Sequence, residues 1–210
     1  MPIISRLPLA RRLFGTLIGK QAPAFSVDAA MPDDSFKRVA LNDFSGKYVC
    51  LYFWPADFTF VCASETIDFH KKLSEFKSRE CEVLGCSIDT PFVHKAWKST
   101  SKKDGGLGTA INHPMLADVN KTIAKDYEVL LENGLCVRGV FLIDKNGKVR
   151  SEMKNDLPLG RNVDEVIRVL DAIKFTDEHT DQVCPSGWKP GSASMKPTKE
   201  GVADYLSKHT

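Results

Sequence analysis

The chain lacks the paired motif Cys-x-x-Cys, although it contains six cysteines. No histidine stands at a spacing from these cysteines that would complete a zinc site. The sequence shows no secretory signal, and its irregular cysteine spacing argues against a scaffold of structural disulfides. We therefore expect no metal and no bound cofactor. We also expect the thiols to face a reducing compartment, where one or two of them carry out chemistry.

Long apolar runs and a strong excess of one charge are also absent. The longest apolar stretch, residues 48–54, is far shorter than the roughly 20 residues that a membrane-spanning helix needs, and it predicts a buried strand. The formal net charge is only +2. No dense basic stripe with interleaved aromatic residues occurs, as a nucleic-acid-binding surface would require. We expect neither a membrane nor a nucleic acid as a partner.

The small positive excess lies near the N-terminus, where residues 1–27 contain basic but no acidic side chains. We predict that residues 1–17 form an N-terminal arm that packs on the domain or stays mobile. Arginines mixed with apolar residues also occur in mitochondrial transit peptides, but this arm is short, contains two prolines and has few hydroxyl residues. We therefore expect a cytoplasmic protein, with a mitochondrial location as the alternative.

Strand and helix patterns alternate through the first half of the chain. Residues 48–54 have the β-branched and aromatic content of a central strand, and Pro55 cannot extend it. From residue 61 the apolar positions follow helical spacing. A second buried strand over 82–89 follows, and Pro91 then opens another helix. This order predicts a βαβ unit with parallel strands.

The second half continues the alternation and ends in an appendage. Asn146-Gly147 predicts a tight hairpin turn because both residues tolerate positive φ. The remaining predicted elements are a hairpin over 25–41, a strand over 114–118, a helix over 122–129, strands over 135–144 and 148–153, and a helix over 163–175.

Together these elements predict an α/β protein with a thioredoxin-like fold, in which helices flank a central mixed sheet. We divide the chain into the arm 1–17, a domain 18–176 and a C-terminal extension 177–210.

Cys62 is the cysteine whose predicted position favours reactivity. In the first turn of a helix it meets unpaired backbone N–H groups and the positive end of the helix dipole, which stabilise a thiolate. Thr59 either caps that helix or hydrogen-bonds a bound oxygen. Cys184 lies in a tail rich in proline and glycine, where we expect an exposed, mobile thiol. The remaining cysteines, at 50, 81, 86 and 136, are expected to be unreactive, three of them as core thiols within strands.

The segment around Cys62 carries a specific motif. Its sequence, Pro55-Ala56-Asp57-Phe58-Thr59-Phe60-Val61-Cys62, resembles the Pro-x-x-x-Thr-x-x-Cys signature of peroxiredoxins, and Glu65 also fits. Further matches are the Gly-Gly-Leu-Gly of 105–108, the Leu-Cys-Val-Arg-Gly of 135–139, the segment 155–161, and 183–185 followed by Trp188. The resemblance to the typical two-cysteine peroxiredoxins, the alkyl hydroperoxide reductase C and thiol-specific antioxidant family, covers about residues 18–206.

This resemblance implies a role for each matching residue. Cys62 would be the peroxidatic cysteine and Cys184 the resolving one. The peroxide pocket would be completed by Pro55, Thr59 and Arg138, while Glu65 and Arg161 would position Arg138. Without the motif, we would interpret Arg138 as a surface strand residue, and Glu65 and Arg161 as an ordinary ion pair.

The resemblance also implies a reaction and partners. A hydroperoxide would oxidise Cys62 to a sulfenic acid, which Cys184 of the other subunit of an antiparallel dimer would convert to a disulfide. A dithiol donor, either thioredoxin-like or a flavoprotein reductase system, would reduce that disulfide. A ring of five dimers is the expected assembly. Because disulfide formation needs Cα atoms within roughly 7 Å, the helix turn at Cys62 would have to unwind first.

Three departures and three rival interpretations accompany this resemblance. The tail reads Tyr205-Leu206 where family members that excess peroxide inactivates easily have Tyr-Phe, so we expect intermediate sensitivity to excess peroxide. Ala63-Ser64 stands where the family usually has Pro-Thr, so we expect a turn that unwinds more readily and catalysis that survives. Trp54 replaces the commoner Tyr. A thioredoxin-like disulfide reductase would need Cys-x-x-Cys, which argues strongly against it. A one-cysteine peroxidase and an oligomeric holdase chaperone remain alternatives.

Overall fold

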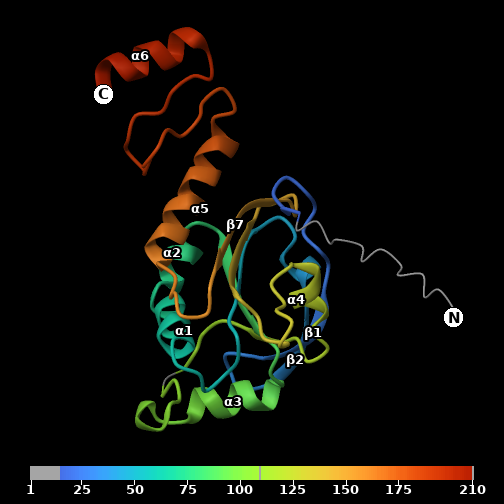
Figure 1. Ribbon diagram of the computed structural model, residues 1–210. Coiled ribbons are helices and arrows are strands. Elements are labelled where there is room, and N and C mark those ends of the chain that lie inside the picture. The colour runs from blue at the N-terminus through green and yellow to red at the C-terminus, as the bar shows by residue number, and fades with distance from the viewer. Residues whose placement is uncertain (1–14, 109, 210) are drawn as a thin grey trace, which may run out of the picture.

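A seven-stranded mixed sheet forms the centre of the computed structural model, which describes residues 15–108 and 110–209 (Figure 1). The strand order is β2-β1-β5-β4-β3-β6-β7, with β3, β4 and β5 parallel and the remaining pairs antiparallel. The strands are β1 (Ser26–Ala30), β2 (Phe36–Ala40), β3 (Tyr48–Phe53), β4 (Cys81–Ser87), β5 (Met115–Ala117), β6 (Arg138–Ile143) and β7 (Val149–Asn155).

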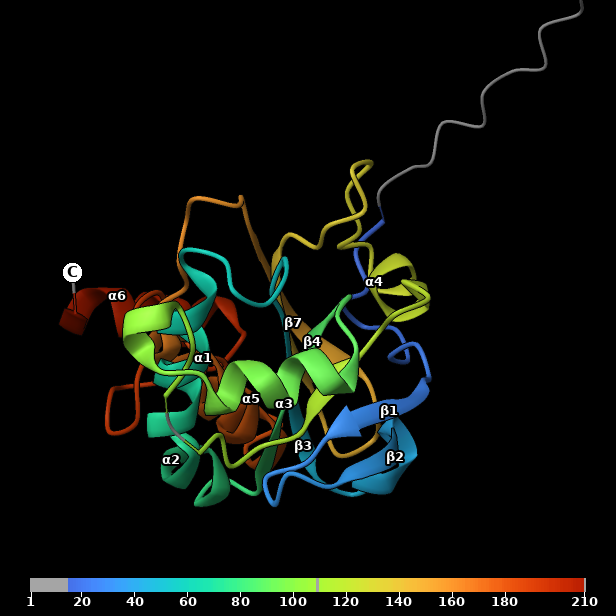
Figure 2. The same cartoon turned by 90° about the horizontal axis from the view of Figure 1, so that it is seen from below.

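Helices cover both faces of this sheet and give it two hydrophobic cores. Side chains of α1, α2 and α5 pack on one face, and those of α4 pack on the other. Figure 2 looks onto α3, which contacts β1 and β5. The helices are α1 (Cys62–Lys71), α2 (Leu73–Lys77), α3 (Pro91–Ser99), α4 (Thr122–Asp126), α5 (Val163–Glu178) and α6 (Lys199–His209), with short 3₁₀ turns η1 (Leu41–Phe44) and η2 (Lys102–Asp104).

Strand β3 is completely covered and leads directly to the predicted reactive segment. All six of its residues are buried, because β4 and β6 flank it and helices cover both faces. Its neighbour Gly85 has no room for a side chain, since a Cβ there would lie 2.7 Å from the Trp54 ring and 2.8 Å from the Tyr52 hydroxyl. These two large rings therefore pack against bare backbone at the end of β3.

The α/β fold and the mixed sheet predicted from the sequence are confirmed, with local differences. The helix predicted over 122–129 ends at Asp126, because the backbone at Glu128 turns to a positive φ of 55°. The helix starting near residue 61 divides at Lys72, whose backbone leaves the helical region with ψ 6°. The strand predicted over 135–144 begins only at Arg138, because a tight turn closed by Gly134 N–H to the Leu131 carbonyl returns the chain on itself. Cys136 therefore forms an isolated bridge with Leu130 instead of joining the sheet. Helix α5 continues through Glu178, three residues beyond its predicted end.

The segment after α5 stands apart from the body of the molecule in Figure 1, and α6 has no buried residue. It is tied to α5 mainly through Trp188, whose ring lies 4.8 Å from that of Phe175 and whose carbonyl accepts a 2.7 Å hydrogen bond from Arg168. Among the described residues, no helix is both long and apolar enough to cross a membrane. The predicted N-terminal arm lies mostly in residues 1–14, outside the described residues.

Candidate active site

Cys62 is the first residue of α1, as predicted, and its side chain is completely buried. It follows the loop that leaves β3 at Pro55, which is also buried. The helix begins without a side-chain cap, because its N-cap residue is Val61. The backbone N–H groups of this first turn therefore keep no side-chain acceptor, and they favour negative charge close to the sulfur.

Thr59 contacts the sulfur directly and does not cap the helix. Its hydroxyl oxygen lies 2.8 Å from Cys62 Sγ and 2.7 Å from the carbonyl oxygen of Ala56. The hydroxyl has one proton, and a carbonyl can only accept. When Cys62 is a thiol, Thr59 donates to Ala56 and accepts from the sulfur. When Cys62 is a thiolate, the hydroxyl can turn to donate to the sulfur. Thr59 therefore suits both protonation states.

Arg138 reaches the same sulfur from the start of β6. Its Nη1 donates to Cys62 Sγ at 3.3 Å and to Glu65 Oε2 at 2.5 Å, while its Nε donates to the Leu157 carbonyl at 2.7 Å. The side chain is buried, so it is not the surface strand residue that spacing alone favoured. Burial would lower the pKa of Arg138, but the bond to Cys62 and the charge of Glu65 outweigh it and raise the pKa. The guanidinium stays charged.

Glu65 joins this arginine to a second one, Arg161. The Arg161 side chain donates to Glu65 from Nε at 2.7 Å and from Nη2 at 2.9 Å. Its Nη1 donates at 2.7 Å to the carbonyls of both Phe53 and Gly139, at the ends of β3 and β6. These bonds hold α1, β3, β6 and the loop before α5 in one arrangement around the sulfur. The pair is therefore fully buried and shared, unlike an ordinary surface ion pair.

The charges of this cluster do not balance without the sulfur. Two buried guanidinium groups, those of Arg138 and Arg161, face the single carboxylate of Glu65. A negative charge on Cys62 Sγ, 3.3 Å from Arg138, would complete the balance. Unbalanced buried charge is costly, so the cluster is suited to hold a negatively charged group beside Arg138. The site provides a nucleophile together with a donor aimed at the reacting atom.

Comparison with known proteins identifies the family of this chain. The family model described as AhpC/TSA family matches residues 18–152, and the one described as the C-terminal domain of 1-Cys peroxiredoxin matches residues 172–208. Peroxiredoxin-1 of Gekko japonicus is 49% identical over 193 residues, which cover 91% of this chain and 96% of that protein. The chain belongs to the AhpC/TSA family, the peroxiredoxins.

Solved structures give the same result for the fold. The reduced 2-Cys peroxiredoxin of Plasmodium vivax is 47% identical, with a TM-score of 0.89 over 92% of this chain and 100% of that one. The mitochondrial 2-Cys peroxiredoxin of Plasmodium falciparum is 41% identical, with a TM-score of 0.76 over 80% of this chain and 99% of that one. The predicted thioredoxin-like peroxiredoxin fold is therefore confirmed.

Membership of the peroxiredoxin family establishes the activity of the protein. This peroxiredoxin is a thiol peroxidase, as predicted from the sequence. In the described part of the chain, no group of three or more potential metal ligands occurs.

The structure does not bring Cys184 to the cluster within one chain. In this peroxiredoxin Cys184 is half-buried rather than exposed, and its sulfur lies 3.8 Å from the Ala172 carbonyl of α5. Burial raises the pKa of Cys184, which the positive charge of Arg168 partly offsets. Cys62 and Cys184 therefore have separate sets of neighbours in the described chain.

The remaining cysteines lie in the two cores. Burial raises the pKa of Cys50 and of Cys136 to about 12, and raises the pKa values of Cys81 and Cys86 well above their usual range. Each is buried and free. They are protonated near neutral pH, which makes them poor nucleophiles.

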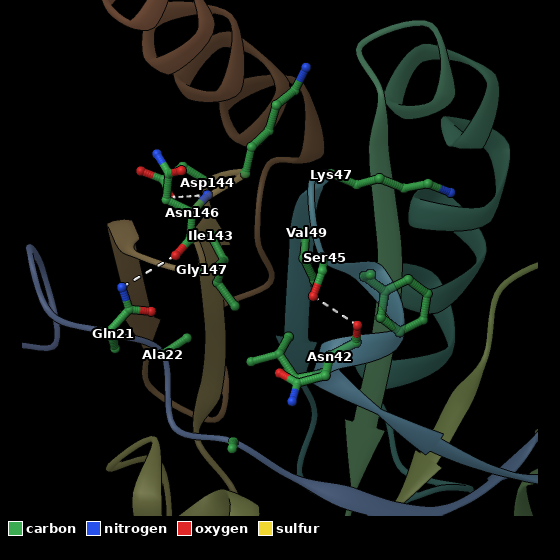
Figure 3. A pocket seen from close by; sticks show the side chains of 14 residues that line it. Gln21, Ala22, Asn42, Ser45, Lys47, Val49, Ile143, Asp144, Asn146 and Gly147 are labelled. Atoms are coloured by element: carbon green, nitrogen blue, oxygen red, sulfur yellow. Dashed lines mark hydrogen bonds between the residues drawn. The ribbon is translucent and has the colours of Figure 1, made fainter.

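A pocket of about 210 Å³ lies at the other end of β3 and is unrelated to this cluster (Figure 3). Val49 of β3 and its register partner Ile143 of β6 both line it, and Gln21 Nε2 donates to the Asn146 carbonyl at 3.3 Å. It contains none of the predicted site residues.

The sequence prediction missed two polar residues that support the Cys62 loop. Asp57 is buried although it lies in the motif segment, and its carboxylate lies 2.8 Å from Nδ1 of His94, which is completely buried in α3. A histidine between apolar Val93 and Trp97 at helical spacing was the available signal for burial. Nothing in the sequence indicated that Asp57 would be its partner.

Proposed function

We propose that Cys62 is the group that attacks the hydroperoxide and that Cys184 of a second subunit resolves the product. The observation that carries this proposal is the buried contact between Cys62 Sγ and Arg138, in a cluster that has one positive charge in excess without a thiolate. Pro55 and Thr59 complete the pocket, and Glu65 with Arg161 holds Arg138 in place.

The first step uses the thiolate and the donors around it. Cys62 Sγ attacks the terminal oxygen of the hydroperoxide, forming an S–O bond while the O–O bond breaks. The leaving oxygen takes a proton and departs as water or an alcohol, and Cys62 becomes a sulfenic acid. Arg138 and the Thr59 hydroxyl stabilise the negative charge that develops on the two oxygens. Hydrogen peroxide and organic hydroperoxides are both substrates.

The second step forms a disulfide and releases water. The Cys184 thiolate of the partner attacks the Cys62 sulfur, and the hydroxyl of the sulfenic acid leaves as water. The buried Cys62 must first leave its helical turn to meet another sulfur. In the described chain Cys184 contacts α5 rather than the Cys62 cluster, which supports an intersubunit pair in an antiparallel dimer.

The disulfide then requires a dithiol donor. We propose a thioredoxin-like protein, with a flavoprotein reductase system as the alternative, because two thiols restore both cysteines by exchange. Five dimers forming a ring is the proposed assembly. In this arrangement the peroxidase domain of 18–176 carries Cys62 and the extension of 177–210 carries the resolving cysteine to the partner.

We propose that the protein acts in the cytoplasm, a reducing compartment where six free cysteines persist. The mitochondrion is the alternative, and the Plasmodium falciparum relative is named as mitochondrial. Fusing residues 1–17 to a fluorescent protein in the source cell tests this: diffuse fluorescence supports the cytoplasm, and mitochondrial fluorescence contradicts it.

Turnover by three proteins tests the mechanism. We expect the wild type to consume peroxide with thioredoxin, thioredoxin reductase and NADPH, and to form a dimer-sized band on non-reducing gels. Cys62→Ser should lose all turnover, and Cys184→Ser should lose both thioredoxin-dependent turnover and the band. Continued cycling of Cys184→Ser would indicate a one-cysteine mechanism. If Cys62→Ser retained all the function of the wild type, a holdase role would be favoured.

A further inference from the structure

A buried hydrogen-bonded pair joins α3 to the loop that precedes Cys62. His94 Nδ1 lies 2.8 Å from Asp57 Oδ2, and both side chains are completely shielded from solvent. The second oxygen of Asp57 accepts a 2.8 Å bond from the Trp54 ring N–H. Every polar atom of the two side chains has a partner, because His94 Nε2 also lies 3.1 Å from the Leu116 carbonyl.

The partners of this pair determine where its protons are. A carbonyl can only accept, so His94 Nε2 carries a proton and donates to Leu116. A second proton then lies between Nδ1 and the Asp57 carboxylate, on one or the other. Burial raises the pKa of Asp57, and the bond to His94 partly offsets that effect. In either form the pair is neutral as a unit and fully bonded, which makes it a rigid connection.

The connection leads to the reactive sulfur in two steps. Asp57 follows Ala56, whose carbonyl accepts from the Thr59 hydroxyl, and that hydroxyl touches Cys62 Sγ. The backbone N–H of Asp57 donates to Asp89 Oδ2 at 2.9 Å, and Ser87 donates to the same oxygen at 2.6 Å. The next residue, Phe58, has φ +55°, a conformation that is unfavourable for a bulky side chain unless its surroundings impose it.

We propose that Asp57 and His94 are positioning residues that hold the Thr59 side of the Cys62 pocket closed and so set the balance between two steps. The inference rests on the proposed function. While the loop is held, Thr59 and Arg138 meet the sulfur together and peroxide reacts quickly. For a disulfide to form, the Cys62 turn must leave this arrangement. The pair therefore favours reaction with peroxide and slows resolution.

Breaking the Asp57–His94 pair should change the rates of the two steps in opposite directions. Asp57→Ala and His94→Phe should lower the second-order rate of Cys62 oxidation about tenfold, since the pocket groups are no longer held together. The same variants should raise the peroxide-independent rate of disulfide formation about tenfold, because a lost buried hydrogen bond shifts the opening equilibrium by that factor. Less Cys62 should reach the sulfinic acid under excess peroxide, since its sulfenic acid is resolved sooner.

Asp57→Asn is the matched rescue. An amide can accept from the Trp54 N–H through its oxygen and donate from its nitrogen to a neutral His94 Nδ1, so both bonds survive. We expect both rates of Asp57→Asn to lie near those of the wild type. A role limited to stability would slow or spare both steps alike and would not increase the rate of resolution. Ser87→Ala loosens the loop through Asp89 with the pair intact, and should shift both rates in the same directions as Asp57→Ala by a smaller factor.

Rapid mixing with hydrogen peroxide, acid quenching and mass spectrometry would measure the sulfenic acid, disulfide and sulfinic acid over time. We expect slower oxidation and faster resolution in Asp57→Ala and His94→Phe, and recovery of both rates in Asp57→Asn. If neither Asp57→Ala nor His94→Phe folds, Ser87→Ala should show the same two changes. Unchanged or equally slowed steps would overturn the positioning role. Failure of the wild type to form a Cys62 sulfenic acid would instead overturn the proposed function.

Discussion

Arg138 Nη1 lies 3.3 Å from the sulfur of Cys62, although 76 positions separate the two residues. The same nitrogen lies 2.5 Å from Glu65. One guanidinium thus connects the start of β6 to two residues of the first turn of α1. This contact places a positive charge beside the proposed nucleophile.

Arg138→Lys should lower kcat/KM for hydrogen peroxide by about 100-fold, the usual cost of removing one donor from a developing negative charge. Lysine keeps the charge but cannot make separate bonds to Cys62, Glu65 and the Leu157 carbonyl in a fixed geometry. Steady-state turnover with thioredoxin measures this effect. Arg150→Lys, on neighbouring β7 and bonded to Asp144 and Asp177, is the control. Equal losses in both variants would contradict the role of Arg138.

Thr59→Val should slow Cys62 oxidation by about 100-fold, whereas Thr59→Ser should keep most of the rate. Serine retains a hydroxyl that can exchange its proton between the Ala56 carbonyl and the sulfur, and valine retains only the shape. Stopped-flow measurement of the first oxidation step separates this effect from later steps. Similar rates for the two variants would show that packing alone explains the position of Thr59.

Glu65→Gln should reduce the free energy of unfolding by about 3–5 kcal/mol, because it leaves two buried guanidinium groups without their carboxylate. Urea unfolding at neutral pH measures the loss. Glu82→Gln removes the partner of Lys47 in an exposed pair and should cost less than about 1 kcal/mol. A Glu65 variant as stable as the Glu82 variant would mean that the cluster is not the structural centre of the site.

Local patterns in the sequence predicted most of the fold but not the contacts of the site. The buried strand β3, the helix beginning at Cys62 and the turn at Asn146-Gly147 all follow from neighbouring residues. The motif indicated the residues of the cluster, but bonds such as that from Arg161 to the Phe53 carbonyl join distant segments and depend on the complete fold. The half-buried state of Cys184 and the Asp57–His94 pair escaped prediction for the same reason.

His113 should make the protein less stable in acid. Burial lowers its pKa to about 3 from the ordinary 6.5, so the unfolded chain takes up the proton first. Stability is therefore unaffected by this group above pH 6.5 and falls as the pH decreases from 6.5 towards 3, by about 2 kcal/mol at pH 5. His113→Leu combined with Tyr52→Phe removes both members of the 2.8 Å hydrogen bond.

Urea unfolding at pH 7 and pH 5 would test this effect. The difference between the two pH values should be smaller in the double variant than in the wild type by about 2 kcal/mol. An identical difference in the two proteins would show that His113 is not the group responsible.

Alkylation of the native reduced protein should distinguish the reactive cysteines from the core ones. Cys184 is partly exposed, and Cys62 becomes accessible when its turn opens, so both should be labelled by iodoacetamide at pH 7.5. Cys50 and Cys136, whose pKa values burial raises to about 12, should remain unlabelled, as should Cys81 and Cys86. Peptide mass spectrometry gives the pattern, and denatured protein with all six cysteines labelled is the control.

The most direct test of the account is to trap the first oxidation product. Cys184→Ser is mixed with one equivalent of hydrogen peroxide and with dimedone, which reacts with sulfenic acids, and the modified peptide is sequenced by mass spectrometry. We expect one dimedone adduct per chain, on Cys62, and none when Arg138→Met is added and the reaction is stopped early. Modification of another cysteine, or full and rapid oxidation without Arg138, would contradict it.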